Sequence, residues 1–135
     1  MDVTLPRTTA RGERSPTVET LALMGGVFLV QFPLSLVGLA GPFALSPAFP
    51  AAPWTLVTSV YSHAGPGHLL GNAVLLAVVG LLVERVTTRL RFHAYFVATG
   101  ATAGLVEVLA PSLTGPTAVL GASGAVSALL GYVVA

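Results

Sequence analysis

The chain has 135 residues, of which 54% are hydrophobic and only 8% are charged, and its formal net charge is +1. A soluble domain carries about 25% charged residues, so this composition excludes an ordinary soluble protein and indicates an integral membrane protein. Cysteine is absent, which excludes disulfides, thiolate metal sites and cysteine catalysis. All six basic residues are arginines in two short clusters beside apolar segments, a pattern that orients membrane helices and does not indicate nucleic-acid binding.

The N-terminal part of the chain combines a polar tail with a first apolar stretch. Residues 1–19 are rich in Thr, Arg and Pro, and we expect them to form a disordered cytoplasmic tail. The apolar stretch at about 20–41 exceeds the roughly 7–15 residues of a signal-peptide core, which favours a retained membrane span. Because Gln31 and Pro33 interrupt this span, we expect the face that carries them to pack on other helices. Four prolines in residues 42–53 predict a loop.

An interfacial segment and three further apolar stretches follow this loop. Residues 54–67 mix aromatic and polar side chains and are interpreted as an interfacial segment. A second span is predicted at about 68–84, a third at about 92–109 and a fourth at about 118–135. A bilayer core about 30 Å thick needs about 20 apolar helical residues per span, so the expected fold class is an all-α, polytopic transmembrane helix bundle.

The arginines predict the orientation of the spans. Three precede the first span and three lie between the second and third spans, so both clusters are expected on the same side of the membrane. By the positive-inside rule that side is the cytoplasm. We therefore predict a multi-pass cell-membrane protein with a cytoplasmic N-terminus. The use of Arg without Lys, together with abundant Ala, Gly and Val, favours a prokaryotic source.

Polar side chains gather at the outer end of the second span. His68 and Asn72 are four residues apart and therefore share one face of a helix, offset by about 40°. Polar groups at membrane depth are costly and are candidates for function, although a hydrogen bond between helices is an alternative explanation. His63 lies about 140° around a helix from His68, and no Cys or carboxylate is nearby, which disfavours a metal site.

A serine flanked by glycines begins the fourth apolar stretch, in the segment Gly121–Ala125. Glycines beside Ser123 leave its hydroxyl accessible, as a nucleophile requires. If Ser123 converges with the polar pair of the second span, it could attack a carbonyl while the pair stabilises the oxyanion. The alternative is packing, because Ser123, Ser127 and Gly131 recur every four residues and could let another helix approach closely.

Two charged or titratable positions near the inner side are given structural interpretations. His93 follows Arg91 closely and is interpreted as a solvated interfacial side chain. Glu84 is interpreted as the end of the second span, beside Arg85.

Taken together and in chain order, these features resemble the rhomboid family of intramembrane serine proteases. The segments that carry the resemblance are Trp54–Thr58, His63, His68 with Asn72, Gly80–Glu84 and Gly121–Ala125. The resemblance implies that Ser123 is the nucleophile, that His68 and Asn72 form the oxyanion hole, and that His63 is a supporting residue. It also implies cleavage of transmembrane protein substrates near the outer membrane surface, within the lipid bilayer, and no metal or organic cofactor.

The sequence departs from the family pattern at two catalytic positions. Rhomboids use a histidine base on a sixth core helix, whereas all three histidines of this chain precede Ser123. Residues 20–135 would then form a partial rhomboid domain with four of the usual six core helices, a fragment expected to be inactive alone because serine without a base is a poor nucleophile. The family commonly has an aromatic residue four positions after the nucleophile, where this chain has Ser127. The alternatives are a non-catalytic rhomboid-like protein that binds transmembrane helices and an unrelated four-helix membrane protein.

Overall fold

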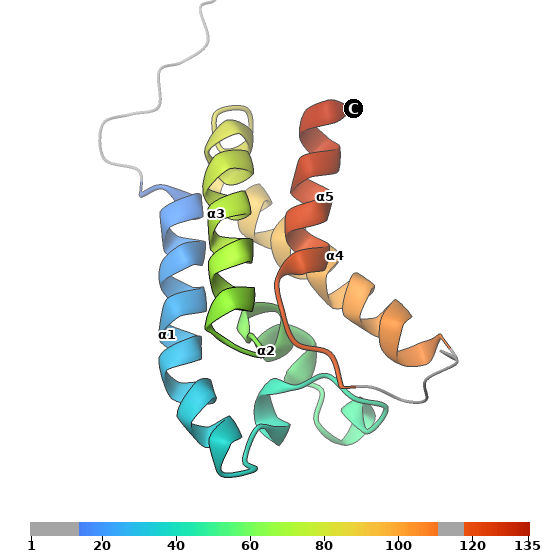
Figure 1. Cartoon of the computed structure of the whole chain (residues 1–135). Helices are drawn as coiled ribbons and strands as arrows, with labels where there is room; N and C mark the ends of the chain where they lie inside the picture. Colours follow the sequence, from blue (N-terminus) through green and yellow to red (C-terminus); the bar gives the residue numbers. More distant parts are fainter. Residues whose placement is uncertain (1–13, 111–117) are drawn as a thin grey trace, which may run out of the picture.

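The computed structural model describes residues 14–110 and 118–135, and these fold into helices joined by short connections (Figure 1). The elements in chain order are α1 (Pro16–Leu36), η1 (Gly41–Phe43), η2 (Phe49–Ala51), α2 (Thr55–Tyr61), α3 (Pro66–Val83), α4 (Arg89–Leu109) and α5 (Ser123–Val134). Within the described ranges the chain forms no strand, and its β pairing is limited to an isolated bridge. The predicted all-α class is confirmed.

Three of the helices are long and apolar enough to cross a membrane. They are α1 and α4, each with 21 residues, and α3 with 18 residues. Much of their outward surface is apolar: Leu29 is 77% exposed and Val78 is 60% exposed, as suits side chains that face lipid. The fourth apolar helix, α5, has 12 residues.

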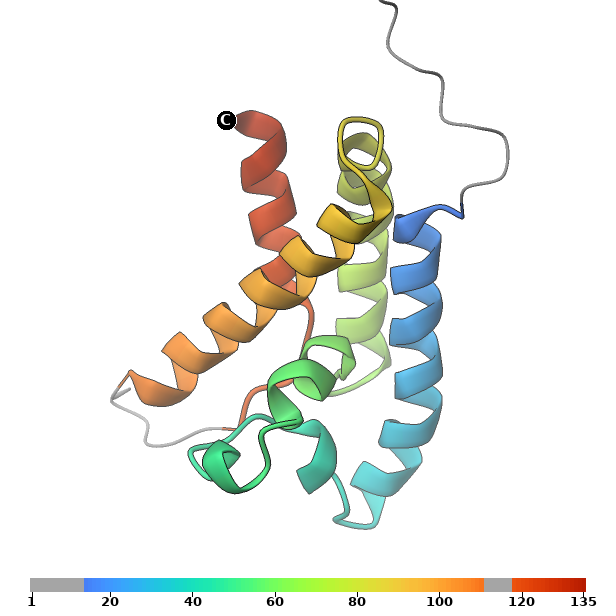
Figure 2. The same ribbon diagram turned by 180° about the vertical axis from the view of Figure 1, so that it is seen from behind.

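The helices form one bundle in which α3 has a neighbour on each side (Figure 1). Helix α1 runs antiparallel to α3, while α5 runs parallel to α3 and packs on both α3 and α4. Helix α4 slants across the bundle, as the view from behind shows (Figure 2). The short helix α2 packs on α4 and α1 at the end of the bundle where α1 finishes.

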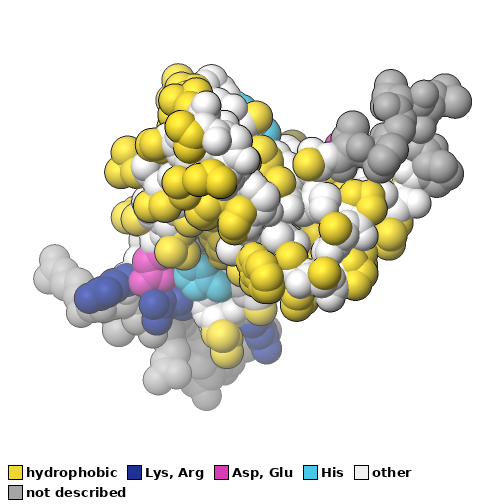
Figure 3. All heavy atoms as spheres, turned by 90° about the horizontal axis from the view of Figure 1, so that it is seen from below, with side chains coloured by type: hydrophobic (Ala, Val, Ile, Leu, Met, Phe, Trp, Pro, Cys, Tyr) yellow, Lys and Arg dark blue, Asp and Glu magenta, His cyan; other side chains and the backbone are white. Residues whose placement is uncertain are grey.

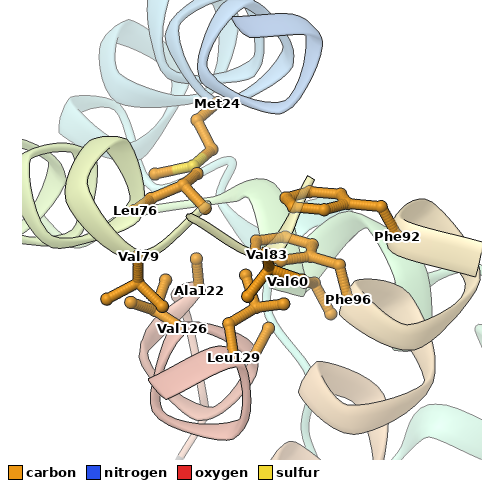
Figure 4. Close-up of a cluster of buried hydrophobic side chains, with 11 residues drawn as sticks. Met24, Val60, Leu76, Val79, Val83, Phe92, Phe96, Ala122, Val126 and Leu129 are labelled. Carbon is orange, nitrogen blue, oxygen red and sulfur yellow. The ribbon is translucent and has the colours of Figure 1, made fainter. Parts of the chain in front are cut away.

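A single hydrophobic core joins all five α-helices (Figure 4). Every fourth residue of α4 is buried, and these residues form a stripe that winds around the helix by about 40° per step: Phe92, Phe96, Gly100, Gly104 and Val108. The two glycines in this stripe permit close approach. A Cβ at Gly100 would lie 2.7 Å from Val60, and one at Gly104 would lie 2.9 Å from Leu45. Small residues at these positions therefore let α2 and the loop after α1 rest on α4.

Helix α1 begins at Pro16, earlier than predicted, so four residues assigned to the tail belong to the helix. The Ser15 side chain caps the helix, and the Glu84 carboxylate accepts hydrogen bonds from the Ser15 hydroxyl at 2.7 Å and from the Thr17 N–H at 3.2 Å. Proline at the first helical position and a carboxylate beside the N-terminus both favour a start there. The rest of the predicted tail, residues 1–13, lies outside the described residues.

Helix α5 begins at Ser123, five residues later than predicted. The preceding segment is held by Leu45 and Val119, which exchange two backbone hydrogen bonds of 3.0 and 2.7 Å. The Gly121 N–H then donates to the Ser59 carbonyl at 2.9 Å. These bonds to the loop and to α2 hold residues 118–122 outside the helix.

Arg14 lies with Arg85 and Arg89 of the second arginine cluster at one end of the bundle, here called the inner end, where α1 begins and α3 connects to α4. The Glu19 carboxylate joins α1 to α4 at this end, since Arg89 Nε lies 2.8 Å and His93 Nε2 lies 2.9 Å from Glu19 Oε2. Figure 3 shows charged side chains gathered in one region beside a mostly apolar surface. The interpretation of His93 as a solvated side chain is wrong, because α1 and α4 pack together there and half-bury its ring.

Candidate active site

The first turns of α3 hold two of the predicted site residues at the end of the bundle opposite the arginines. Pro66 occupies the first helical position after the N-cap Gly65, so His68 lies in the first turn and Asn72 lies one turn later. The Asn72 Nδ2 donates to the His68 carbonyl at 3.0 Å, and the Asn72 side chain is buried. This bond uses one of the two Nδ2 hydrogens and leaves the other available to a ligand.

Ser123 is the first residue of α5, and its side chain is exposed. The residue before it, Ala122, makes no side-chain capping bond to the helix. The first N–H groups of a helix have no intrahelical partner, and the helix dipole makes that end favourable to negative charge. The Ser123 hydroxyl therefore stands beside backbone donors that suit an anion.

The His68 ring lies against the chain that leads into Ser123. Gly121 has φ of +128°, a conformation that side chains disfavour, and a Cβ at this position would lie 2.6 Å from His68 Cε1 and 3.0 Å from Nε2. Glycine is thus needed at position 121 both for its backbone conformation and for its lack of a side chain. Because Gly121 has no side chain, the His68 imidazole of α3 can lie in direct contact with the start of α5.

The hydrogen bond to His68 indicates which ring nitrogen donates. The Ala64 N–H points to His68 Nδ1 at 3.5 Å, a long bond. In neutral imidazole the nitrogen that accepts is unprotonated and the other carries the proton, so this contact favours the tautomer with the proton on Nε2. Nε2 is the ring nitrogen nearer to Gly121, since it lies 3.0 Å from the position that a Cβ would take there, whereas Nδ1 lies at 3.7 Å.

His63 is completely buried in the loop between α2 and α3, outside the three long helices. Its ring meets the His68 ring edge to face, with centroids 5.2 Å apart. Burial, reinforced by the nearby His68, lowers the pKa of His63 to about 4, although the Tyr61 carbonyl opposes this shift. His63 is therefore a neutral ring that packs against the ring of His68.

The burial of the residues on α5 bears on the alternative that Ser123 serves only in helix packing. Ser127 and Gly131 are exposed, like Ser123, and a Cβ at Gly131 would meet no described atom within 4 Å. The residue of this segment that permits close approach is Gly124, where a Cβ would collide with the Cβ of Ala103 on α4. Among the described residues of this segment, Gly124 is thus the small residue that lets α4 approach closely. The face of α5 that carries Ser123 stays open.

The structure brings His63, His68 and Asn72 together and sets His68 against Gly121, two residues before Ser123. Among the described residues it gives no hydrogen bond from a histidine ring to the Ser123 hydroxyl. Sequence reasoning singled out these four residues but missed the contact partners of His68. The glycine two positions before Ser123 was the sequence feature from which the contact between His68 and Gly121 could have been predicted.

Gln31 is a further residue at this end that was not assigned to the site. It is completely buried on α1, as predicted, whereas Pro33, expected on the same packed face, is exposed. Two residues after Gln31 the helix has turned by about 200°, so one packed face cannot hold both residues.

Comparisons with known proteins show which family the chain resembles. A Rhomboid domain profile matches residues 50–135. Rhomboid-related protein 3 of Homo sapiens is 36% identical over 111 residues, which cover 80% of this chain and 27% of that protein. The Mus musculus protein of the same name is 35% identical over 113 residues, which cover 82% of this chain and 27% of the relative. RHOMBOID-like protein 5 of Arabidopsis thaliana is 35% identical over 78 residues, covering 58% of this chain and 25% of that protein.

The chain spans about a quarter of the length of the curated relatives it matches. These three relatives are eukaryotic and give no support to the prokaryotic source expected from composition. The matched domain covers more than half of the chain and includes every residue of the candidate site except Gln31. With three helices suited to crossing a membrane, this is a multi-pass membrane protein that belongs to the rhomboid family.

Proposed function

We propose that this chain carries the nucleophile and the oxyanion-binding residues of an intramembrane serine endopeptidase that cleaves transmembrane proteins near the outer membrane surface. The observation that supports this most strongly is the position of His68. Its Nε2 lies near Gly121, two residues before Ser123, while its Nδ1 accepts from Ala64. In the tautomer with the proton on Nε2, His68 presents a hydrogen-bond donor close to the segment that leads into the exposed Ser123.

In the proposed reaction, the Ser123 Oγ attacks the carbonyl carbon of the scissile peptide bond and gives its proton to a general base. The carbonyl oxygen becomes an oxyanion, which accepts hydrogen bonds from His68 Nε2–H, from Asn72 Nδ2–H and from the first N–H groups of α5. The carbon–nitrogen bond then breaks, and the leaving amine takes the proton from the base. Water hydrolyses the resulting acyl-enzyme and regenerates the serine.

The base in this scheme is supplied from outside the described residues. His63 is buried behind His68, and His93 lies at the inner end beside Glu19. The exposed face of α5, with Ser123 and Ser127, is open to a partner that would carry the base. Catalysis by the described residues alone is therefore not expected.

The proposed orientation places the inner end in the cytoplasm. Arg14 lies there with Arg85 and Arg89, as the positive-inside rule requires of a cytoplasmic surface. Ser123 and His68 lie toward the opposite end of the bundle, so the site would face the outer leaflet. Water could then reach the acyl-enzyme from outside while the apolar surroundings strengthen the hydrogen bonds to the oxyanion.

The test is cleavage of a transmembrane reporter substrate in liposomes by the full natural reading frame that contains residues 1–135. Ser123→Ala is expected to abolish cleavage. His68→Ala and Asn72→Ala should each slow it by about 10²–10³-fold, the usual effect of removing one oxyanion donor. His93→Ala is the matched control and should leave cleavage unchanged, because that histidine lies at the inner end. If the folded wild-type protein binds the reporter helix without cleaving it, the catalytic proposal is wrong and a helix-binding role replaces it.

A further inference from the structure

Gln31 is the polar side chain that α1 contributes to the candidate site, and it lies outside the residues matched by the Rhomboid domain profile. Its side chain has no exposed surface. Burying an amide costs free energy unless it is hydrogen-bonded, and this cost is greatest in a helix that crosses a membrane. The contribution of Gln31 to the site therefore depends on which group its amide oxygen hydrogen-bonds.

The Gln31 Oε1 accepts a hydrogen bond from the backbone N–H of His63 at 3.1 Å. His63 is in the four-residue connection between α2 and α3, residues 62–65. At the α2 end of this connection, Ser62 is held by its own bonds, from its N–H to the Ser59 carbonyl and from its hydroxyl to the Thr58 carbonyl. Gln31 adds an anchor from a third helix in the middle of the connection.

The next peptide group along the chain is the one that touches His68. Ala64 N–H donates to His68 Nδ1, while the ring of His63 packs edge to face on the ring of His68. Two consecutive N–H groups thus point to Gln31 on one side and to His68 on the other. A shift of the peptide group that carries the His63 N–H would also move the neighbouring Ala64 N–H. The bond from Ala64 to His68 Nδ1 is already 3.5 Å long, so a further increase would break it.

We infer that Gln31 is a positioning residue that fixes the tautomer and orientation of His68 through the two consecutive peptide groups between Ser62 and Ala64. When Gln31 holds the His63 N–H, the next N–H, that of Ala64, stays directed at His68, which keeps Nδ1 of His68 as an acceptor and Nε2 as the donor near the start of α5. This inference rests on the proposed function for its catalytic consequence, but the hydrogen-bond geometry that it describes does not depend on catalysis.

The experiment compares Gln31→Met with the wild type, both as the full natural reading frame containing residues 1–135. Methionine has nearly the volume of glutamine but cannot accept this hydrogen bond. Thr20→Val is the matched control, because Thr20 is also buried on α1 but bonds within the helix, to the Pro16 carbonyl. If Gln31→Met does not fold, Gln31→Asn takes its place, since its shorter side chain keeps the amide but withdraws the oxygen from His63.

The first readout is nitrogen NMR of histidine-labelled protein, with the His68 signals identified by their absence from His68→Ala. We expect His68 to be protonated on Nε2 in the wild type and in Thr20→Val, and to become a mixture of tautomers when the Gln31 oxygen is lost. Gln31→Glu keeps an acceptor oxygen at this position and should restore the wild-type tautomer. An unchanged His68 tautomer in a folded variant that lacks the oxygen would overturn the inference.

The second readout is cleavage of the transmembrane reporter. A misplaced oxyanion donor affects the transition state more than substrate binding, so Gln31→Met should lower kcat by about 10–100-fold and leave KM nearly unchanged. Thr20→Val should retain kcat. If the wild type does not cleave, the proposed function fails, and the NMR result still decides the inference about Gln31. If the wild type cleaves and the tautomer changes without any loss of kcat, His68 is not the oxyanion donor and the positioning role is wrong.

Discussion

The imidazole of His68 occupies the space that a side chain at position 121 would need, with Nε2 only 3.0 Å from the position of a Cβ there. This contact joins the first turn of α3 to the residue from which the chain enters α5. It also explains why Ser123 and His68, which lie far apart in sequence, can belong to one site.

Gly121→Ala is expected to disturb both the fold and the proposed site. Alanine at φ +128° is strained by about 1–3 kcal/mol, and its methyl group would push the His68 ring away from α5. Thermal unfolding in micelles should show a lower Tm, and reporter cleavage should fall more than the loss of folded protein explains. Gly26→Ala on α1 is the control, since a Cβ there meets no described atom within 4 Å. Equal cleavage per folded molecule in the Gly121 variant and the wild type would contradict the contact.

Glu84→Ala is expected to loosen the inner end of the bundle. The carboxylate accepts from the Ser15 hydroxyl and from the Thr17 N–H, so its loss removes the tie between α1 and α3 and should cost about 1–3 kcal/mol of unfolding free energy. Glu84→Gln retains an acceptor oxygen and should cost less. Glu107→Ala is the control, because that side chain is exposed near the end of α4. Chemical denaturation in micelles measures all three, and equal effects of the two alanine variants would refute the tie.

Stability should fall as the pH is lowered through the range in which His63 titrates. In the unfolded chain this histidine takes up a proton near its ordinary pKa of 6.5, whereas burial lowers its pKa in the fold to about 4. The unfolded state therefore binds more protons between these values, so stability present above pH 6.5 is lost progressively down to about pH 4. The full loss is about 3 kcal/mol. His63→Phe keeps a ring beside His68 and should remove this part of the pH dependence; an unchanged slope would show that other groups cause it.

The contact between α5 and α4 can be tested with a compensating pair. Gly124→Ala places a methyl group against Ala103, and overpacking of this kind costs about 1–3 kcal/mol. Adding Ala103→Gly reopens the space and should recover part of the loss, although glycine within α4 itself costs about 0.5–1 kcal/mol. A double-mutant cycle of unfolding free energies measures the coupling, and purely additive effects would mean that the two positions do not touch.

The sequence was sufficient for the helices and for the candidate residues because both depend on local patterns. Apolar stretches of about 20 residues predicted α1, α3 and α4, and the spacing of His68 and Asn72 placed them on one helix face. Helix starts were less predictable because they depend on distant residues. The start of α1 depends on Glu84, and the start of α5 depends on the bridge between Leu45 and Val119.

Dependence on distant residues also explains which features around the site were not predicted from the sequence. The role of His93 depends on Glu19, a residue in another helix, and no local pattern joins the two. The bond between Gln31 and the His63 peptide is likewise a contact across the bundle. Gln31 could be recognised as a buried polar residue from its sequence context, but its partner required the packing of α1 against the connection between α2 and α3.

The most direct test of the central claim is covalent labelling of the full natural reading frame that contains residues 1–135 with a fluorophosphonate probe, followed by mass spectrometry of the labelled peptide. The account predicts an adduct on Ser123 that is lost in Ser123→Ala and retained in Ser127→Ala, whose serine is equally exposed one turn further along α5. Labelling that persists in folded Ser123→Ala, or an adduct on another serine of the folded wild type, would contradict the assignment of Ser123 as the nucleophile.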